Sequence, residues 1–486
     1  MTQIAPSTAL LGREMCVFID GAWRAGHGDQ IVSVDPSTGQ RIAEFQGARP
    51  EDVAVAAEAA TRAFGTWRRL PSTQRAAFLR GFAEGLRRRK DDLVQLQMLN
   101  NGKPRIEAEI DVDDAAATFD YYADLAETLD ARQDGAVELP DSTLRGRTRF
   151  EPVGPVALIV PWNFPMVTTA WKLAPALAVG CTAVLKPSEF TTPAELVYGD
   201  IALEIGLPAG VLNILPGAGA VGGAMTAEPR FRKISFTGSN ATGRRVMAAA
   251  AERSVPVSLE LGGKSPIVIL DDADVAQAVE IAALGIFFNA GQMCSATSRM
   301  ILSDRIADDV IAGLRRHVAG MVVAGHQDPR AEMGPLTTAA QRDKVLEYLL
   351  RARHDGLDCL TGGASTGPQS GFFVEPTVYL DVPTDHAIWR EEIFGPVLAI
   401  RRVSSDDEAL ALANENDFGL AATVVGGARA EDMANHIDAG HVWVNSPQII
   451  FPNTAWGGFK ASGIGRELGP WGLAAYSGVK HVTSRA

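Results

Sequence analysis

The chain has 486 residues, of which 46% are hydrophobic and 21% are charged, and its formal net charge is −13. Domains usually hold about 100 to 200 residues, so this length predicts two or three of them, and the composition excludes a disordered chain. The acidic balance argues against nucleic acid and anionic membrane as partners. The sequence shows neither a run of about 18 apolar residues nor a basic, apolar leader, so we expect a cytoplasmic protein.

The sequence begins with a strand-and-turn pattern at 17–23, followed by a helical block from about residue 51 to 101. A second helical pattern covers 106 to about 129. Apolar and polar residues then alternate at 144–150, which is typical of an exposed antiparallel strand.

From residue 154 onward, short apolar strands alternate with helices, which is the pattern of a parallel, doubly wound sheet. The predicted strands are 156–160, 182–185, 211–215 and 233–236. A second run of the same kind begins at 266–270 and continues to about residue 444. The predicted fold class is therefore α/β, with two doubly wound domains.

A dinucleotide site is suggested by two separate patterns. Residues 217–222 fit GxGxxG after a strand, but no acidic residue follows between 231 and 251, so an ordinary Rossmann site is not indicated. The strand at 182–185 ends in Lys186 and Glu189, and the strand at 233–236 ends in 237–239, whose N–H groups and hydroxyls suit a phosphate. A plain helix N-cap by Ser239 is the alternative.

Cys16, Cys181, Cys294 and Cys359 lie far apart and form no CxxC pair, so neither a disulfide framework nor a zinc site is expected. The eight histidines show no ligand spacing either, and we predict no catalytic metal. Cys294 lies among small and polar residues, unlike a typical core cysteine, whereas Cys181 precedes a buried strand and suits an inert core thiol.

Two further residues are candidates for catalysis. Glu260 lies between two leucines, where burial would raise its pKa toward that of a general base; a buried carboxylate paired with lysine or arginine is the alternative. Asn163 lies between two prolines, and its amide could stabilise an oxyanion or simply shape a turn.

Seven segments in this order resemble the aldehyde dehydrogenase superfamily: 161–165 (PWNFP), 186–189 (KPSE), 236–239 (FTGS), 260–264 (ELGGK), 291–294 (GQMC), 391–396 (EEIFGP) and 460–467 (KASGIGRE). The resemblance extends from residue 18 to Tyr476. Its C-terminal motifs are similar to those of the betaine and aminoaldehyde dehydrogenase branch.

The resemblance implies a reaction in two stages on a cysteine. Cys294 would attack the aldehyde, and Asn163 with the Cys294 N–H would hold the oxyanion of the thiohemiacetal. Oxidation would leave a thioester, which water activated by Glu260 would hydrolyse to the carboxylic acid. Lys172 and Glu467 match positions of a proton relay from Glu260.

The resemblance also implies the residues that bind the cofactor. Lys186 and Glu189 would hold the adenosine ribose, Ser239 the pyrophosphate, and Glu392 and Phe394 the nicotinamide riboside. Glu189 would repel a 2′-phosphate, so NAD is predicted to be preferred over NADP. The full predicted cofactor set is Ile159, Trp162, Lys186, Ser188, Glu189, Gly219, Gly223, Phe236, Thr237, Gly238, Ser239, Leu261, Glu392 and Phe394.

The predicted substrate pocket consists of Phe164, Trp171, Phe288 and Trp456, which match positions of an aromatic cage for quaternary ammonium in the betaine branch. Two of the four are phenylalanine, a weaker cation–π partner. We therefore expect an apolar aliphatic or aromatic aldehyde, with a betaine or amino aldehyde as the alternative substrate class.

The resemblance implies three parts: a NAD-binding domain (1–122 and 146–262), a catalytic domain (263–461) and a small antiparallel oligomerisation arm (123–145 and 462–486). The arm predicts a homodimer or homotetramer. A relative of the same fold that transfers the acyl group to coenzyme A is the rival mechanism, although such relatives usually lack the carboxylate found here at Glu260. A binding protein that has lost activity is disfavoured, because Cys294, Glu260 and Asn163 are all present.

Overall fold

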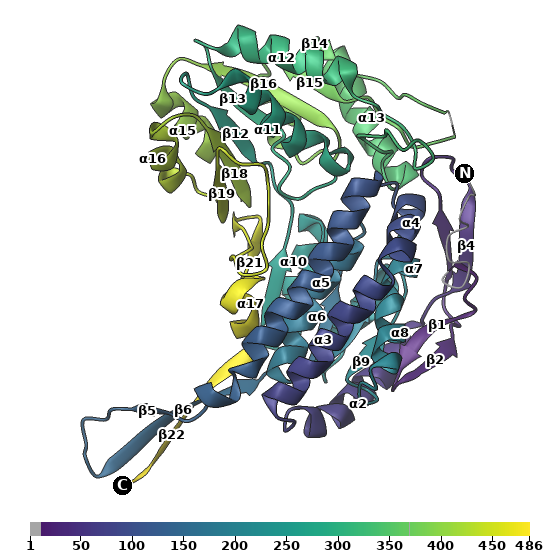
Figure 1. Ribbon diagram of the computed structural model, residues 1–486, viewed down its shortest axis with the longest axis vertical. Coiled ribbons are helices and arrows are strands. Elements are labelled where there is room, and N and C mark those ends of the chain that lie inside the picture. The colour runs from purple at the N-terminus through teal and green to yellow at the C-terminus, as the bar shows by residue number, and fades with distance from the viewer. Residues whose placement is uncertain (1–10, 369) are drawn as a thin grey trace.

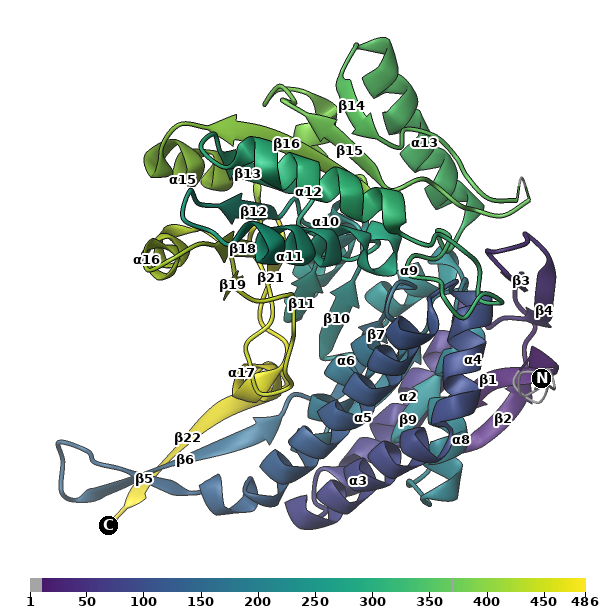
Figure 2. The same ribbon diagram turned by 45° about the horizontal axis from the view of Figure 1, so that its top comes forward.

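A computed structural model describes residues 11–368 and 370–486. Figure 1 shows two α/β lobes, one above the other, and a narrow β arm that projects away from the lower lobe. The same layers are visible after rotation (Figure 2). No helix that the structure describes is both long enough and apolar enough to cross a membrane.

The lower lobe is built on an eight-stranded sheet. Its strands are β1 (Met15–Ile19), β2 (Ala22–Ala25), β7 (Pro155–Ile159), β8 (Thr182–Lys186), β9 (Leu212–Ile214), β10 (Lys233–Thr237), β11 (Val257–Glu260) and β21 (Gly463–Ile464), in the order β2-β1-β9-β8-β7-β10-β11-β21. Strands β9, β8, β7, β10 and β11 run parallel. The chain moves outward from β7 to β9 and then returns to the other side of β7, which makes the switch point where such sheets bind ligands.

Helices cover this sheet: α2 (Pro50–Trp67), α3 (Ser72–Arg88), α4 (Lys90–Asn100), α5 (Arg105–Glu127), η1 (Asp130–Arg132), α6 (Pro165–Val179), α7 (Thr192–Glu195), α8 (Val197–Glu204), α9 (Gly219–Ala227) and α10 (Asn240–Glu252). The helical block predicted at 51–101 is three helices, because Pro71 disfavours helical geometry at the residue before it and the chain turns again at Arg89.

Helix α6 is the element that carries buried groups into the site. It begins with Pro165, whose fixed φ suits a first helical turn, and it ends at Gly180 with φ 101°, a left-handed conformation that glycine adopts readily. Almost all of its side chains are buried, including Lys172. The helix packs against β7 and β8, and α5 packs against it in turn.

The upper lobe is built on a seven-stranded sheet. Its strands are β12 (Pro266–Ile269), β13 (Arg299–Ser303), β14 (Asp358–Thr361), β15 (Thr377–Leu380), β16 (Val397–Val403), β18 (Ala421–Val425) and β19 (His441–Val444), in the order β14-β15-β16-β13-β12-β18-β19. All neighbours are parallel except β14 and β15. Its helices are α11 (Val275–Phe287), η2 (Phe288–Gly291), α12 (Ala307–Gly320), α13 (Ala339–His354), α14 (Ala387–Arg390), α15 (Asp406–Asn414) and α16 (Arg429–His436).

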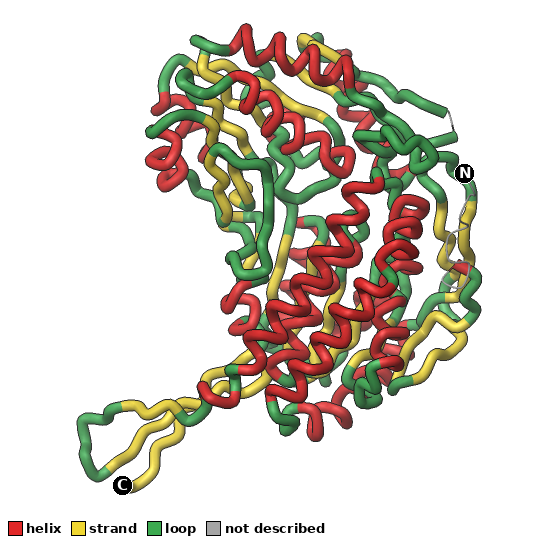
Figure 3. Tube along the Cα trace, in the orientation of Figure 1, coloured by secondary structure: helices red, strands yellow, loops and turns green. Residues whose placement is uncertain are grey.

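The arm is a three-stranded antiparallel sheet. Strand β6 (Leu144–Pro152) pairs with β22 (Ser477–Arg485) along its whole length and with β5 (Gly135–Val137) on its other edge. The remaining elements are the hairpin β3 (Gln30–Val34) and β4 (Arg41–Gln46), the short pair β17 (Phe418–Gly419) and β20 (Phe459–Lys460), and helix α17 (Gly469–Ala474). Figure 3 shows the arm as strands and loops separated from the helices of both lobes.

The structure confirms the predicted fold class of two doubly wound α/β layers with a small antiparallel arm. The exposed strand predicted at 144–150 is β6, and the predicted strands of both lobes are present. Strand β6 runs on to residue 152, past the domain boundary predicted at residue 145.

Candidate active site

The carboxyl ends of the central strands in the lower lobe bring most of the predicted cofactor residues together. Ile159 ends β7, Lys186 ends β8, and Phe236 with Thr237 ends β10. Trp162, Gly238 and Leu261 follow the ends of β7, β10 and β11. These are the positions at which an open α/β sheet binds its ligand.

A helix start at this edge offers a place for phosphate. The Ser239 hydroxyl caps α10 by accepting the Thr242 N–H at 3.3 Å, as an N-cap residue should. On α9, a Cβ built at Gly219 or Gly223 would meet nothing within 4 Å, so there is open space beside this helix. N–H groups and the helix dipole favour an anion at such a start, so the residues present fit a dinucleotide.

Lys186 and Glu189 lie beside this space. Lys186 is buried, and its Nζ donates to the carbonyl of Pro187 at 2.8 Å and to Glu189 Oε2 at 3.5 Å. Burial lowers the pKa of Lys186, although Glu189 opposes this shift. Ser188 is buried beside them, whereas the Glu189 side chain is 33% exposed and can accept hydrogen bonds from a ligand.

Glu392 and Phe394 reach the same region from the upper lobe, on the segment between α14 and β16. Glu392 Oε1 accepts the Gly263 N–H at 3.0 Å, and burial raises the pKa of Glu392. A Cβ at Gly262 would come within 2.2 Å of Glu392 Oε2, so a larger residue there would displace the Glu392 carboxylate. The rings of Phe394 and Trp162 meet edge to face at 5.4 Å, which joins the two lobes at the site.

Cys294 lies in the loop after η2. Cys16 and Cys181 are buried and Cys359 is exposed, whereas Cys294 is half-buried. It packs against a cluster of Leu420, Ala421, Trp443, Trp456 and Leu468, against which Trp171 also packs. Burial, with the negative charges of Glu260 and Glu392, raises the pKa of the Cys294 thiol to about 12. The thiol is therefore protonated at neutral pH and needs a base to become a nucleophile.

Asn163 is buried next to this loop. Its Nδ2 donates to the Gln292 carbonyl at 3.0 Å, two residues before Cys294. A carboxamide carries two N–H groups, so one donor remains for a substrate oxygen. The amide is thus held firmly in a position that suits an oxyanion donor.

Glu260 ends β11 and is 3% exposed. Neither of its carboxylate oxygens has a hydrogen-bond partner among the residues that the structure describes. Burial raises the pKa of Glu260 well above its usual range, with a further contribution from the charge of Glu467, while Lys172 and Arg466 oppose the shift. The raised pKa expected from the sequence is confirmed, and the alternative of a directly paired carboxylate is not observed.

Lys172 and Glu467 form a buried ion pair next to Glu260. The hydroxyl of Ser235 also donates to Glu467 Oε1, at 3.2 Å. Glu467 and Trp456 exchange two backbone hydrogen bonds of 2.8 Å, which pairs the backbone of Glu467 with that of an aromatic residue of the predicted pocket. The structure therefore brings all five predicted catalytic residues into one region.

The four predicted pocket residues form two aromatic pairs. The rings of Phe164 and Phe288 are nearly parallel, with centroids 6.2 Å apart, and those of Trp171 and Trp456 lie 5.6 Å apart. The sequence did not point to Trp443, whose ring lies 6.4 Å from Trp456, nor to His441, at 5.9 Å from the same ring.

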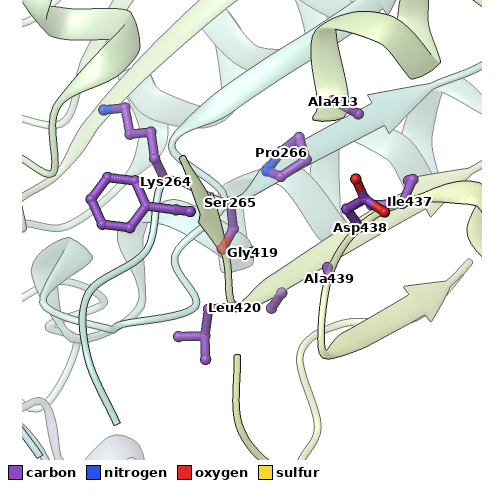
Figure 4. A pocket seen from close by; sticks show the side chains of 11 residues that line it. Lys264, Ser265, Pro266, Ala413, Gly419, Leu420, Ile437, Asp438 and Ala439 are labelled. Carbon is purple, nitrogen blue, oxygen red and sulfur yellow. The ribbon is translucent and has the colours of Figure 1, made fainter. Parts of the chain in front are cut away.

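Two hollows in the described part of the chain are lined by other residues than these four. One is lined by Gly263, Gly291, Met293, Glu392 and Phe394 together with Ile286, Ala296, Ser298, Ile393 and Gly395. The other contains none of the predicted site residues; Figure 4 shows Lys264 and Asp438 on opposite sides of it. Burial lowers the pKa of Lys264 to about 7.

Comparison with known proteins identifies the family. The sequence profile of the Aldehyde dehydrogenase family matches residues 23–482. The chain belongs to the aldehyde dehydrogenase family. It is an NAD(P)-dependent enzyme of that family, as the resemblance of its motifs implied.

Individual relatives agree in length and fold. A peroxisomal aminoaldehyde dehydrogenase 2 from Malus domestica is 44% identical over 477 residues, which cover 96% of this chain and 95% of the relative. A chloroplastic betaine aldehyde dehydrogenase from Beta vulgaris is 42% identical over 478 residues, covering 96% of each chain. An aldehyde dehydrogenase from Bacillus cereus, solved as a complex with NAD+, superimposes with a TM-score of 0.96 at 35% identity, over 100% of this chain and 99% of that one.

Several residues that shape this aldehyde dehydrogenase site were not found from the sequence. Lys344 donates to the Glu392 carbonyl at 3.0 Å, and Gln341 donates to the Phe394 carbonyl at 2.7 Å. Asn289 and Glu107 tie the Cys294 loop to the lower lobe. Nothing in their spacing marks them, because each acts through a contact between segments distant in sequence.

Proposed function

We propose that this enzyme oxidises an aldehyde to the free carboxylic acid with NAD, using Cys294 as nucleophile and Glu260 as general base. The observation that supports this best is the buried Glu260 carboxyl, whose two oxygens have no partner among the described residues, close enough to Cys294 for its charge to raise the pKa of the thiol. A buried carboxylate with its lone pairs unused is suited to take a proton from a thiol or from water.

In the first stage the Cys294 sulfur forms a bond to the carbonyl carbon while Glu260 accepts the thiol proton. The Asn163 amide and the Cys294 N–H donate to the resulting oxyanion. When bound, the nicotinamide ring supplies the hydride acceptor of the oxidation, which leaves the acyl group on Cys294 as a thioester. Lys186, Ser188, Glu189 and Ser239 would hold the adenosine and pyrophosphate parts, and Glu392 with Phe394 the nicotinamide part.

Before the second stage, Lys172 and Glu467 would carry the thiol proton away from Glu260. Glu260 then takes a proton from a water molecule, whose oxygen attacks the thioester; the acid is released and the departing Cys294 sulfur recovers a proton from Glu260. The test is to measure NADH formation with an aldehyde and to identify the product with and without coenzyme A. Free acid formed without coenzyme A is expected. A requirement for coenzyme A would instead assign the acylating reaction.

For the substrate, we propose an aldehyde with an apolar aliphatic or aromatic chain. Phe164 and Phe288 face each other as plain hydrocarbon rings, and the Lys103 ammonium already lies 4.3 Å from the centre of the Phe164 ring. The ammonium group of a cationic substrate near the Phe164 ring would be repelled by the positive charge of Lys103.

Amino or betaine aldehydes are the second candidate, favoured by the names of the relatives and by the Trp171–Trp456 pair. Values of kcat/KM for hexanal, benzaldehyde, betaine aldehyde and 3-aminopropanal distinguish the two classes. We expect the first two aldehydes to be preferred. A higher kcat/KM for either cationic aldehyde would reverse the assignment.

We propose that NAD is preferred over NADP. The Glu189 carboxylate at the ribose end would accept hydrogen bonds from ribose hydroxyls and repel a 2′-phosphate, while the adjacent Lys186 partly offsets this charge. Measuring kcat/KM with both cofactors tests the proposal. A higher value with NADP would overturn it.

We propose a homodimer or homotetramer assembled through the arm. Strand β22 pairs on one edge only within the described chain, and Val479 on it is 72% exposed. Exposed strand edges favour pairing with another strand. Sedimentation at micromolar concentration should show a dimer or a tetramer, and a monomer would contradict this.

The division into a NAD-binding domain, a catalytic domain and the arm is part of the same proposal. The resemblance assigned residues 146–152 to the NAD-binding domain, but they belong to strand β6 of the three-stranded sheet, so we propose that the arm includes them. The cytoplasmic location stays a prediction, since relatives are named as peroxisomal or chloroplastic.

A further inference from the structure

The chain adopts an unfavourable backbone conformation just before Cys294. Asn289 has φ 50° and ψ 33°, Ala290 has φ 53° and ψ 35°, and Gly291 has φ 73°. Two consecutive non-glycine residues in the left-handed region are costly, because each Cβ approaches the following carbonyl oxygen. Such a turn persists only where the surroundings hold it in place.

One side chain from the lower lobe holds this turn. Glu107, on α5, is 2% exposed, and its Oε1 accepts the Asn289 N–H at 2.8 Å. The Asn289 side chain in turn donates to the carbonyls of Asn163, at 3.1 Å, and Gln292, at 3.2 Å. The same Gln292 carbonyl accepts the Asn163 amide. The Glu107 carboxyl therefore accepts the backbone N–H of the turn itself, while the side chains of Asn163 and Asn289 connect that turn with the oxyanion amide and the nucleophile loop.

The charges around Glu107 do not provide it with a direct ion pair. Lys103 pairs with Asp111 at 2.9 Å, and Asp111 also accepts the Val167 N–H at the start of α6. Burial raises the pKa of Glu107 to about 8, while the Asn289 N–H and the charge of Lys103 oppose the shift. The hydrogen-bond acceptor oxygen, rather than a negative charge, is thus the feature of Glu107 that the turn uses.

We propose that Glu107 is a positioning residue for aldehyde oxidation, because its Oε1 holds the left-handed turn 289–291 and so places the Asn163 amide and Cys294 for attack. This inference rests on the proposed function of Cys294 and Asn163. Glu107 lies on α5 and is not among the predicted catalytic, cofactor or substrate residues. The inference adds it to the residues that determine the rate of aldehyde oxidation.

The test compares three substitutions that separate the acceptor oxygen from the charge. Glu107→Gln keeps an acceptor at the same reach, Glu107→Asp keeps a carboxyl but shortens it by one methylene, and Glu107→Met removes the acceptor. We expect Glu107→Met to lower kcat by about 10- to 100-fold, as small displacements of reacting groups do. The KM for NAD should stay near its original value. Glu107→Asp should be impaired to an intermediate degree, and Glu107→Gln should retain most of the activity.

A second readout follows the nucleophile directly. The rate of Cys294 alkylation by iodoacetamide should change in Glu107→Met and Glu107→Asp but not in Glu107→Gln. Thr182→Val is the matched control, since it removes a buried 2.8 Å hydrogen bond to the Ala60 carbonyl at the opposite end of β8. It should lower the melting temperature while leaving kcat and the alkylation rate unchanged.

The outcomes distinguish the inference from the function on which it rests. If the original enzyme forms no NADH with any aldehyde, the proposed function fails. If that enzyme is active and folded Glu107→Met keeps its kcat and alkylation rate, the positioning role alone fails. If Glu107→Met does not fold, the kcat values of Glu107→Gln and Glu107→Asp decide. A higher kcat in Glu107→Gln supports the inference, and a lower kcat in Glu107→Gln than in Glu107→Asp would overturn it.

Discussion

The two sides of the candidate active site are held in opposite ways. On one side, the Cys294 loop (residues 288–294) is tied by short hydrogen bonds. Gln292 donates to the Asn289 carbonyl at 2.9 Å, and its Oε1 accepts the Thr337 N–H at 2.9 Å. On the other side, Glu260 reaches the same space from β11 with no hydrogen-bond partner for its carboxylate among the described residues.

The difference fits the roles proposed for the two sides. A nucleophile and its oxyanion donor must be kept in a fixed geometry, so their loop is connected throughout. A general base needs unused lone pairs and a pKa above that of an ordinary carboxyl, and burial without a partner leaves the lone pairs free and raises the pKa of Glu260. An unsatisfied buried carboxyl costs free energy, and at Glu260 the proposed chemistry makes use of both free oxygens.

The largest loss of activity should come from removing the Cys294 thiol, at the end of the Cys294 loop. Cys294→Ala is expected to lower aldehyde-dependent NADH formation by at least about 10⁴-fold, because no covalent intermediate can form. Cys181→Ala is the control: this thiol is fully buried at the opposite end of β8 and donates to the Tyr476 carbonyl at 3.5 Å. It should leave kcat almost unchanged. Activity that survived in Cys294→Ala would overturn the mechanism.

The second-largest loss of activity should come from changing Glu260, whose carboxylate has no hydrogen-bond partner among the described residues. Glu260→Gln keeps the shape but removes the base, so steady-state turnover should fall by about 10²- to 10⁴-fold. Stopped-flow absorbance should show whether NADH appears in a burst of at most one equivalent, as expected if loss of the base slows thioester hydrolysis more than the first stage.

Glu195 supplies the comparison, since its two carboxylate oxygens accept the hydroxyls of Thr169 and Thr191 at 3.2 and 3.3 Å. The Glu195→Gln enzyme should turn over at close to the original rate. An equal loss of turnover in Glu260→Gln and Glu195→Gln would mean that the enzyme is equally sensitive to any buried carboxyl. The lack of partners at Glu260 would then have no special role in catalysis.

The fold could be predicted from the sequence because its signals are local. The alternation of apolar strands with helices is visible in the 154–270 segment, and period-two alternation marks β6. The helical block predicted at 51–101 is divided in two places, of which only Pro71 carries a helix-breaking signal; Arg89 carries none, so the second division could not be predicted.

The candidate site could be predicted only in part. Cys294, Glu260 and Asn163 lie in short motifs whose neighbours reveal them. Glu107 and Lys344 lie in ordinary amphipathic helices, and their significance appears only when α5 or α13 packs against a loop about 50 or more residues away. Left-handed geometry at Asn289 and Ala290 was equally hidden, since alanine rarely adopts it.

A smaller effect should come from disturbing the connected loop without touching its chemistry. Gly291 has φ 73°, and a Cβ there would come within 2.1 Å of the Gly395 carbonyl oxygen. Gly291→Ala should therefore lower the free energy of unfolding by about 1 to 3 kcal/mol and also reduce kcat. Urea unfolding and steady-state rates measure the two effects.

Gly65 in α2 is the matched control, because a Cβ there meets nothing within 4 Å. Gly65→Ala should raise stability by about 0.5 to 1 kcal/mol, since alanine is the better helix former. A stabilising Gly291→Ala would show that the loop is not held as tightly as its hydrogen bonds indicate.

The smallest effect concerns pH. In the proposed mechanism Glu260 acts as a base only when deprotonated, and its pKa is raised by burial and by the charge of Glu467. The rate should therefore increase with pH as Glu260 loses its proton. Glu467→Gln removes a negative charge that raises the pKa of Glu260. It also leaves the positive charge of Lys172 without its partner, and this charge lowers the pKa of Glu260. The acidic limb of the kcat profile should move to lower pH by up to about 1 unit.

The position of this limb, rather than the height of the profile, is the quantity to measure, because losing Glu467 also removes a partner of the proposed proton relay. Ser235→Ala provides the comparison: it removes the 3.2 Å hydrogen bond to Glu467 but no charge. Its limb should shift much less than that of Glu467→Gln. A limb that moved to higher pH in Glu467→Gln would mean that Glu467 does not act on Glu260 through its charge, and the rise in the pKa of this base would then come from burial alone.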